Sequence, residues 1–383
     1  LIFHYTVRLP YDQFSNTDAD RISNFRGLKV LFIQDEYDNT FRTWYWIKRL
    51  GIQLVFTVVP QRGIETVYPN HNFPDVRFVT NLTGYAPENL FVGTNTTPPS
   101  KRKLLIGYRG RPLPAHYGLL GREKIAIGRL AKEYCSTKML PHDIEWSEES
   151  RIYGHAWYEF VSSCRSMLGS ESGSNVFDWD GTLASQIAAY KQQHPTASDD
   201  ELYSSIIEQY DQHGLMNQIS PRVFESIALR TVLVLFEGEY SGILSPGVHY
   251  IPLRKDGSNL DEVHRLLVDA AYVDAMAERA YTDIIASGKY SCRSFVQMVD
   301  TELQKSFAQL ACKQSAQLPD ITVGTELSPI STTPIRALPP LFSGQSSAVQ
   351  NKLYTAAYRA WRCLPAPFRE WSKPHLKQLL GRG

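Results

Sequence analysis

Residues 220–236 constrain the fold more than any other part of the chain. The segment begins with a helix start, because Ser220 suits a helix cap and Pro221 suits the first helical position, where its missing N–H is not needed. Apolar side chains then recur at helical spacing. Residues 231–236 are apolar and β-branched, which is typical of a strand covered on both faces. The segment predicts an α/β fold with a parallel sheet; the alternative is an ordinary amphipathic helix that leads into a core strand.

The same alternation of strand and helix patterns runs through two parts of the chain. With 383 residues, the chain is long enough for two domains, each with its own core. In the first part we expect strands at 1–7, 29–34, 54–59 and 76–79 and a helix at 40–50. In the second part we expect strands at 104–107, 166–169, 231–236 and 249–253 and helices at 124–135, 158–164 and 261–286. Such alternation predicts parallel sheets with helices on both faces.

The predicted organisation has five parts. Residues 1–95 form a Rossmann-like N-terminal domain, which we expect to be truncated, and residues 96–103 form a polar linker with two prolines. Residues 104–310 form a second Rossmann-like domain with a helical insertion at 182–219. Residues 311–346, rich in Pro, Ser and Thr, form another linker, and residues 347–383 form a basic amphipathic tail.

The composition argues against several classes of function. Forty basic residues stand against 39 acidic ones, so the chain has no net positive field for nucleic acid. The five cysteines lie at no spacing typical of a metal site, so we expect reduced thiols, a cytoplasmic setting and no metal or other cofactor. No apolar run approaches the roughly 20 residues that span a bilayer.

A first candidate site follows the predicted strand at 104–107. Arg109 lies in a glycine-containing loop after this strand, and Lys124 lies where a helix begins. A diphosphate that leaves a sugar needs positive charge where its negative charge develops, and arginine and lysine supply this charge in a metal-independent enzyme. The alternative is a solvated basic loop.

Two further loops follow predicted strands. The loop at 169–181 is rich in glycine and serine, which lets backbone N–H groups approach a phosphate closely. The loop at 237–244 can contact a sugar or a phosphate, or it is a plain turn. The candidate residues in the two loops are Glu171, Ser172, Gly173, Ser174, Tyr240, Ser241 and Gly242.

Asp178 and Asp180 offer a different chemistry, because an Asp-x-Asp pair can hold a divalent metal ion. A pattern this short occurs by chance in most chains of this size, so metal binding is kept as the alternative. His249 is expected to be a strand residue and not a catalyst.

The motif at 220–236 resembles the C-terminal half of the GT-B glycosyltransferases, which have two Rossmann-like domains. The shared pattern is an "(R)xFEaxAxGxxxl" element, and the resemblance is of the family 4-like (group 1), bacterial surface-polysaccharide type. It implies that Glu225 contacts the ribose of a donor nucleotide, with Arg222 nearby at the donor. It also implies that Arg109 and Lys124 bind the donor diphosphate.

The chain departs from this family at one position. In the retaining members a second glutamate lies eight residues before the ribose-binding one, and that position is Asn217 here. The sequence therefore does not identify the group that would stabilise positive charge on the sugar.

The resemblance implies a glycosyltransferase that moves a sugar from a nucleotide-sugar to a saccharide or glycolipid acceptor, with retention, in cell-surface polysaccharide synthesis. The acceptor side would lie at the strand ends of the first domain, at His4, Asp35 and Glu36. The alternatives are a non-catalytic sugar- or partner-binding module and another two-Rossmann sugar enzyme, such as an epimerase or a phosphorylase.

The basic tail has two interpretations. Residues 347–383 combine basic and aromatic side chains, so they can lie on the inner face of an anionic membrane and bring the enzyme to a lipid-linked acceptor. Alternatively, the tail packs against the N-terminal domain.

Overall fold

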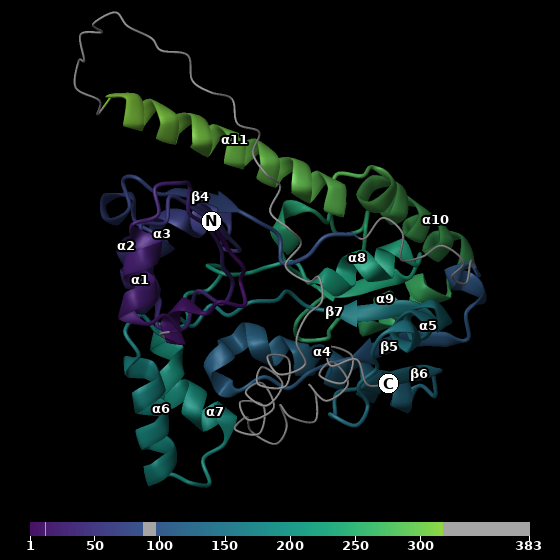
Figure 1. Cartoon of the computed structure of the whole chain (residues 1–383). Coiled ribbons are helices and arrows are strands. Elements are labelled where there is room, and N and C mark those ends of the chain that lie inside the picture. Colours follow the sequence, from purple (N-terminus) through teal and green to yellow (C-terminus); the bar gives the residue numbers. More distant parts are fainter. Residues whose placement is uncertain (12, 87–96, 317–383) are drawn as a thin grey trace, which may run out of the picture. The chain divides into compact units, whose positions relative to one another are not determined.

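The computed structural model describes residues 1–11, 13–86 and 97–316, and it contains two entirely parallel sheets (Figure 1). Both sheets belong to one compact unit. The predicted fold class, α/β with two Rossmann-like sheets, is confirmed. The strands of the first sheet are β1 (Ile2–Phe3), β2 (Val30–Phe32), β3 (Leu54–Thr57) and β4 (Arg77–Thr80). The strands of the second sheet are β5 (Leu104–Arg109), β6 (His142–Glu145), β7 (Cys164–Gly169), β8 (Val232–Phe236) and β9 (Ile251–Leu253).

The first sheet has its strands in chain order, β1-β2-β3-β4, and alternate side chains face opposite layers. Leu31 and Val55 pack on one face, where the helices are α1 (Asn16–Ser23), α2 (Thr40–Leu50) and α3 (Ile64–Val67). Val30, Leu54 and Phe56 pack on the opposite face.

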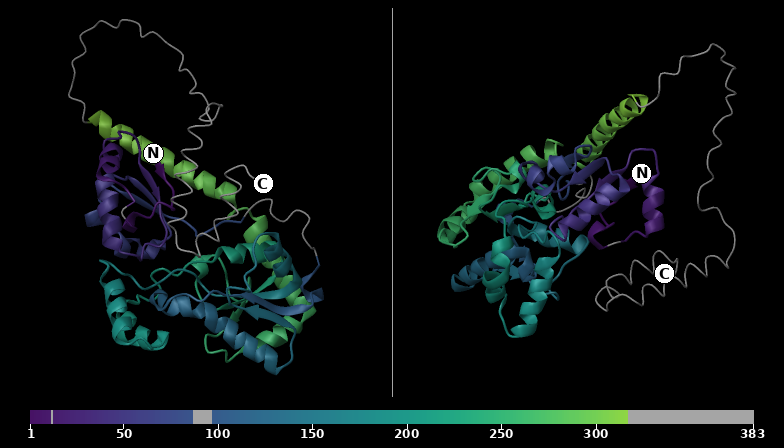
Figure 2. Two further views of the ribbon diagram at one scale, coloured as in Figure 1. Left: turned by 60° about the horizontal axis from the view of Figure 1, so that its bottom comes forward. Right: turned by 90° about the vertical axis from the view of Figure 1, so that its left-hand side faces the viewer.

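That opposite face is covered by α11 (Cys292–Ala316), which follows the second sheet in the chain (Figure 2). Met298, Val299 and Leu303 pack on the strands. The Arg77 guanidinium also donates to the carboxylate of Glu302 at 2.5 Å. The chain thus returns to the first sheet through α11, which begins within the range 104–310 and extends beyond it to Ala316. The packing alternative for residues 347–383 lies outside the described residues.

The second sheet has the order β6-β5-β7-β8-β9 and is covered on both faces. Val232, Val234 and Phe236 of β8 face one helical layer, and Leu233 and Leu235 face the other. The first layer contains α4 (Gly118–Thr137), α9 (Leu260–Val268) and α10 (Ala270–Ala280). The second layer contains α8 (Pro221–Ala228), and α5 (His155–Ser163) packs beside β7. The helices α6 (Thr182–Gln193) and α7 (Asp199–Leu202) follow β7 in the chain and precede α8.

The structure differs from the sequence expectations at two helices. The continuous helix expected at 261–286 is wrong, because Asp269 leaves the helical conformation and its side chain caps α10 by accepting the N–H of Tyr272. Ser220 does precede α8, but its side chain makes no capping hydrogen bond.

Among the described residues, no helix is both long and apolar enough to cross a membrane. Residues 87–96 and 317–383 lie outside the described part, and with them the first residue of the linker at 96–103, most of the second linker and the whole basic tail.

Candidate functional site

The winding of the second sheet reverses between β5 and β7, because β6 lies on one side of β5 and the remaining strands lie on the other. Parallel α/β sheets bind ligands at such a reversal, outside the carboxyl ends of the strands. A cavity of about 250 Å³ lies there. It is lined by the ends of β5 and β7, the loops that follow them, Lys124, Trp157 and the start of α8 with Arg222.

Lys124 projects from α4 into this site. Its Nζ donates to the carbonyl oxygen of Glu171 and to the hydroxyl of Ser172, both at 3.1 Å. Burial, reinforced by the charge of Arg222, lowers the pKa of the Lys124 ammonium to about 8. A buried ammonium that has only neutral partners is typical of a site that awaits an anion.

Two arginines add positive charge to the same cavity. Arg222 is exposed; its Nη1 donates to the carbonyl of Arg109 at 2.5 Å, and its guanidinium lies 5.1 Å from the ring centre of Trp157. Arg111 is exposed in the loop after β5 and also lines the cavity. Within the described part of the chain, neither these arginines nor Lys124 forms an ion pair. Three cations therefore surround one cavity without a paired carboxylate.

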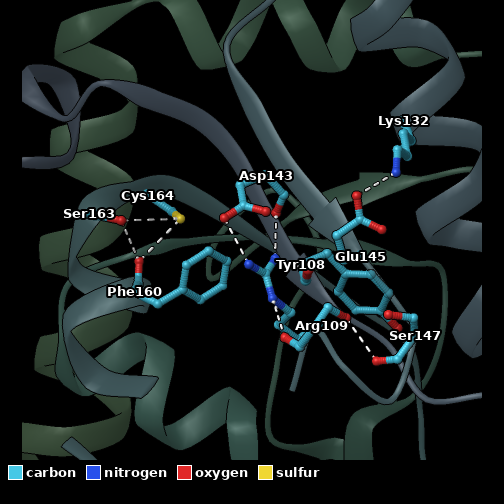
Figure 3. Close-up of polar contacts among 10 residues, drawn as sticks. Tyr108, Arg109, Lys132, Asp143, Glu145, Ser147, Phe160, Ser163 and Cys164 are labelled. Carbon is cyan, nitrogen blue, oxygen red and sulfur yellow. Dashed lines mark hydrogen bonds and ion pairs between the residues drawn. The ribbon is translucent and has the colours of Figure 1, made fainter. Parts of the chain in front are cut away.

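Arg109, two positions before Arg111, has several partners of its own; Figure 3 shows it among Asp143, Tyr108 and Phe160. Its guanidinium pairs with the carboxylate of Asp143 at 2.8 Å and donates to the carbonyls of Tyr108, Asp143 and Ser150. It also lies 4.3 Å from the ring centre of Phe160, and its side chain is only 11% exposed. These contacts support a structural role that ties β5 to β6, and diphosphate binding by Arg109 stays a prediction.

The loop after β7 has a fixed backbone. Ser172 and Gln218 exchange two backbone hydrogen bonds, of 2.7 and 2.9 Å. Gly173 has φ 102°, and a Cβ there would lie 2.2 Å from the carbonyl oxygen of Met216, so only glycine fits. Ser172 lines the cavity, whereas Gly173 and the buried Ser174 lie outside its lining.

Glu171, predicted to contact the donor, is buried and supports the loop after β8. Its carboxylate accepts the N–H groups of Glu239 at 3.2 Å and Tyr240 at 2.7 Å. Asn217 donates to the same carboxylate at 2.6 Å. The position that is a glutamate in the resembled family is therefore bonded to a carboxylate from another loop.

The supported loop is strained. Tyr240, Ser241 and Gly242 have φ of 47°, 57° and 71°, in the left-handed region that non-glycine residues rarely adopt. The Tyr240 hydroxyl donates to the carbonyl of Phe236 at 2.6 Å, and Ser241 accepts the N–H of Ile219 at 3.1 Å. None of the three lines the cavity, and their sugar contact stays a prediction.

Glu225 lies on α8, one turn beyond Arg222. Its carboxylate accepts the indole N–H of Trp157 at 2.8 Å, and burial raises its pKa. Glu225 thereby fixes the Trp157 ring, which lines the cavity. A contact between Glu225 and a ribose stays a prediction.

Asp178 and Asp180 hold the start of α6. Asp178 accepts the N–H groups of Gly181, Leu183 and Ala184 at 2.9 to 3.1 Å, and Asp180 accepts the N–H of Thr182 at 2.9 Å. Their carboxylates thus have partners at a helix N-terminus. Within the described ranges, no group of three or more His, Cys, Asp and Glu side chains could hold a metal ion.

The three residues expected on the acceptor side lie apart from the cavity at β5 and β7. His4 is exposed and its ring bonds to Thr6. Asp35 accepts the hydroxyl of Tyr37 at 2.7 Å. Glu36 is fully buried, where its carboxylate accepts the hydroxyl of Thr57 and the N–H of Val58, and burial raises its pKa to about 7. The structure thus gives Glu36 a place in the core.

Sequence reasoning missed two residues of the site, Arg111 and Trp157. Arg111 and Arg109 are two positions apart and look alike in the sequence, and only the contact with Asp143 separates them. The pairing of Trp157 with Glu225 joins residues 68 positions apart. No local pattern could have revealed either contact.

No protein-family model matches the chain, and no curated protein matches it. Similar solved structures include an alpha-glucosyltransferase in complex with UDP-glucose and DNA containing an abasic site, at 10% identity, 76% of this chain, 77% of that chain and a TM-score of 0.43. Sucrose-phosphate synthase (tll1590) from Thermosynechococcus elongatus is 11% identical, over 76% of this chain and 70% of that one, with a TM-score of 0.34. TarM is 13% identical over 72% of this chain, which spans about half (50%) of TarM, with a TM-score of 0.37.

These structural neighbours are GT-B glycosyltransferases, the family that residues 220–236 resemble. Identities and TM-scores this low do not transfer a function, which has to come from the site itself.

Proposed function

We propose that the chain is a glycosyltransferase that binds a nucleotide-sugar with its diphosphate in the cavity at β5 and β7. The observation that carries the proposal is a set of three cations, Arg111, Lys124 and Arg222, around a cavity at the reversal of sheet winding. None of the three forms an ion pair with another described residue. A diphosphate supplies the negative charge that this cavity lacks.

Each cation has a role in the proposed transfer. The bond between the anomeric carbon and the diphosphate oxygen breaks, a bond to the acceptor hydroxyl oxygen forms, and the hydroxyl proton passes to the leaving diphosphate. Lys124 stabilises the charge that develops on the leaving group from inside the cavity, and Arg111 and Arg222 do so from its rim. The 170–174 loop and Trp157 shape the cavity, and Glu225 positions Trp157 or binds the ribose.

The finer features of the proposal rest on the family resemblance. They are retention of configuration, an acceptor that is a saccharide or lipid-linked saccharide, a role in cell-surface polysaccharide synthesis and a place at the cytoplasmic face of the membrane. The second candidate is a non-catalytic binding module, which Asn217 favours because it replaces a carboxylate of the retaining enzymes.

The proposal is tested by incubating the full chain with UDP-, GDP- and dTDP-sugars and measuring nucleotide release with and without saccharide acceptors. Lys124→Met is expected to lower turnover about 10²–10³-fold, as for the loss of a group that stabilises a developing anion. Lys103→Met is the matched control, because Lys103 is exposed just before β5, at the end of the strand opposite the cavity. Nucleotide binding without turnover would favour the binding module, and equal turnover in both variants would refute the proposed site.

A further inference from the structure

A second cavity, of about 450 Å³, lies beside the first along the same two loops. From the second sheet it is lined by His116 and Tyr117, by Val176 and Asp178, and by the start of α6. Arg8, Tyr11, Tyr37 and Asp38, from the segments that follow β1 and β2 of the first sheet, also line it. No predicted site residue of the donor or acceptor lines it, and only the alternative metal candidate Asp178 does.

Residues that line the two cavities lie close together in the sequence. Leu113 and Ser172 line the first cavity, and His116 and Val176 of the same loops line the second. Three or four residues of extended chain reach at most roughly 11 to 14 Å. On each of the two loops, the residues that line the two cavities are therefore no farther apart than this.

The charges around the second cavity are balanced, unlike those around the first. Arg8 is the one lysine or arginine among its described lining residues, and its guanidinium pairs with Asp38 at 2.7 Å. The Tyr11 hydroxyl donates to the same carboxylate oxygen at 3.1 Å. Burial lowers the pKa of His116, which favours its neutral form, and Asp178 is bonded to the N-terminus of α6. No described residue that lines this cavity is an unpaired lysine or arginine that would attract an anionic ligand.

The aromatic rings in the lining of this cavity favour a sugar ring as its neutral ligand. Tyr37 and Tyr117 lie with ring centres 5.8 Å apart and planes at 68°, and Tyr11 is 56% exposed at the edge. Tyrosine offers an apolar face for the C–H groups of a sugar ring and a hydroxyl for hydrogen bonding. Asp38 and Arg8 are able to accept from and donate to sugar hydroxyls in charge-assisted hydrogen bonds.

We propose that the second cavity binds the acceptor as an uncharged sugar ring, with Tyr11 as a stacking surface and Asp38 as a hydroxyl partner. That the bound sugar is the acceptor rests on the proposed function, whereas the binding of a neutral sugar rests on the cavity alone. In this proposal the acceptor lies at Arg8, Tyr11 and Asp38 and not at His4, Asp35 and Glu36.

Saturation-transfer NMR with the full chain tests the proposal. The probes are the methyl glycosides of glucose, galactose, mannose and N-acetylglucosamine, and the anionic probes are glucuronic acid and glucose 6-phosphate. At least one neutral glycoside is expected to bind, and Tyr11→Ala and Asp38→Asn are each expected to weaken its binding at least about fivefold, the loss of one hydrogen bond or ring contact. Tyr153→Ala is the control, because Tyr153 is 63% exposed and lines neither cavity.

UDP binding by the same proteins separates this proposal from the proposed function. Both variants are expected to bind UDP as the wild type does, since neither residue lines the first cavity. If wild-type protein binds a neutral sugar through Tyr11 but binds no nucleotide, the proposed function fails and the sugar site stands. No binding of any neutral glycoside, a preference for the anionic sugars, or binding that survives Tyr11→Ala would overturn the sugar site.

Discussion

The two sheets present their carboxyl ends to ligands in different ways. The second sheet reverses its winding between β5 and β7, and three cations around the resulting cavity have no ion-pair partner in the part of the chain that the structure describes. The first sheet keeps its strands in chain order. After β2, Glu36 is buried in the core, and Asp38 at the second cavity is paired with Arg8. The difference indicates that strand order decides where a charged site can open, and that the net charge of the chain says little about it.

Substitutions of Arg111 and Arg109 are expected to have the largest effects on nucleotide binding and on stability. Arg111→Ala is expected to weaken UDP binding roughly tenfold to a hundredfold at unchanged stability, because one charge-assisted hydrogen bond is lost. Arg109→Ala is expected to lower the free energy of unfolding by about 1–3 kcal/mol, because it leaves the Asp143 carboxylate and the Ser150 carbonyl without their donor. Calorimetric titration with UDP and denaturant unfolding measure the two effects. If Arg109→Ala lost binding at full stability while Arg111→Ala bound normally, the two roles would be exchanged.

The pH dependence of UDP binding sharpens the comparison further. The pKa of Lys124 is lowered to about 8 in the free protein, and a bound diphosphate raises it. Above pH 8 the protein must therefore take up a proton to bind, and affinity is expected to fall by up to about tenfold per pH unit. Below pH 8 the ammonium is already charged and this dependence vanishes. Lys124→Met should lack the dependence, so an equal slope in both proteins would contradict the role of Lys124.

The closed edge of the first sheet is tested through Glu36. Burial, with the charge of Asp35 as a smaller contribution, raises the pKa of the Glu36 carboxyl from its ordinary 4.5 to about 7. Between these values the unfolded chain binds fewer protons than the folded one, so stability falls as pH rises. The loss is complete above pH 7 and is on the order of 3 kcal/mol.

Glu36→Gln should remove this part of the slope between pH 5 and pH 8, measured by denaturant unfolding. Glu133→Gln, at an exposed position of α4, should leave the slope as in the wild type. A slope unchanged by Glu36→Gln would mean that the carboxyl is not closed in the core.

The smallest expected effect is that of metal removal. Turnover should persist in excess EDTA, because arginine and lysine side chains line the diphosphate site and Asp178 and Asp180 cap α6. The measurement is nucleotide release with EDTA and with added Mn²⁺ or Mg²⁺. An absolute need for a divalent ion that disappears together with the Asp178 and Asp180 carboxylates would restore the metal interpretation.

Much of the fold could be predicted because its signals are local. The periodicity of residues 40–50 and the apolar run at 231–236 predicted α2 and β8 closely. The strand β6 gave no such signal, because it lies at the sheet edge and only Ile144 of its four residues is buried. The helix α11 was not predicted either, because its partner sheet lies more than 200 residues earlier in the chain, as the contact of Arg77 with Glu302 (225 positions apart) shows.

The loops that form the candidate site could be predicted from the sequence, but the partners of its charged side chains could not. The loops after β5 and β7 were identified from strand ends and small residues, and Lys124 and Arg222 do meet at the cavity between them. Long-range contacts decide the rest: Asp143 engages Arg109, Asn217 engages Glu171, and the core encloses Glu36. Charge type is visible in a sequence, whereas the partner of a charge is a property of the fold.

A crystal structure of the full chain with UDP bound tests most directly whether the cavity at β5 and β7 holds a diphosphate. The diphosphate is expected at the carboxyl ends of β5 and β7, with its oxygens within hydrogen-bond distance of Lys124 Nζ and of Arg111 or Arg222, while Arg109 keeps its pairing with Asp143. A diphosphate in the second cavity beside Arg8 and Asp38, or one bound by a freed Arg109 with Lys124 turned away, would contradict this placement.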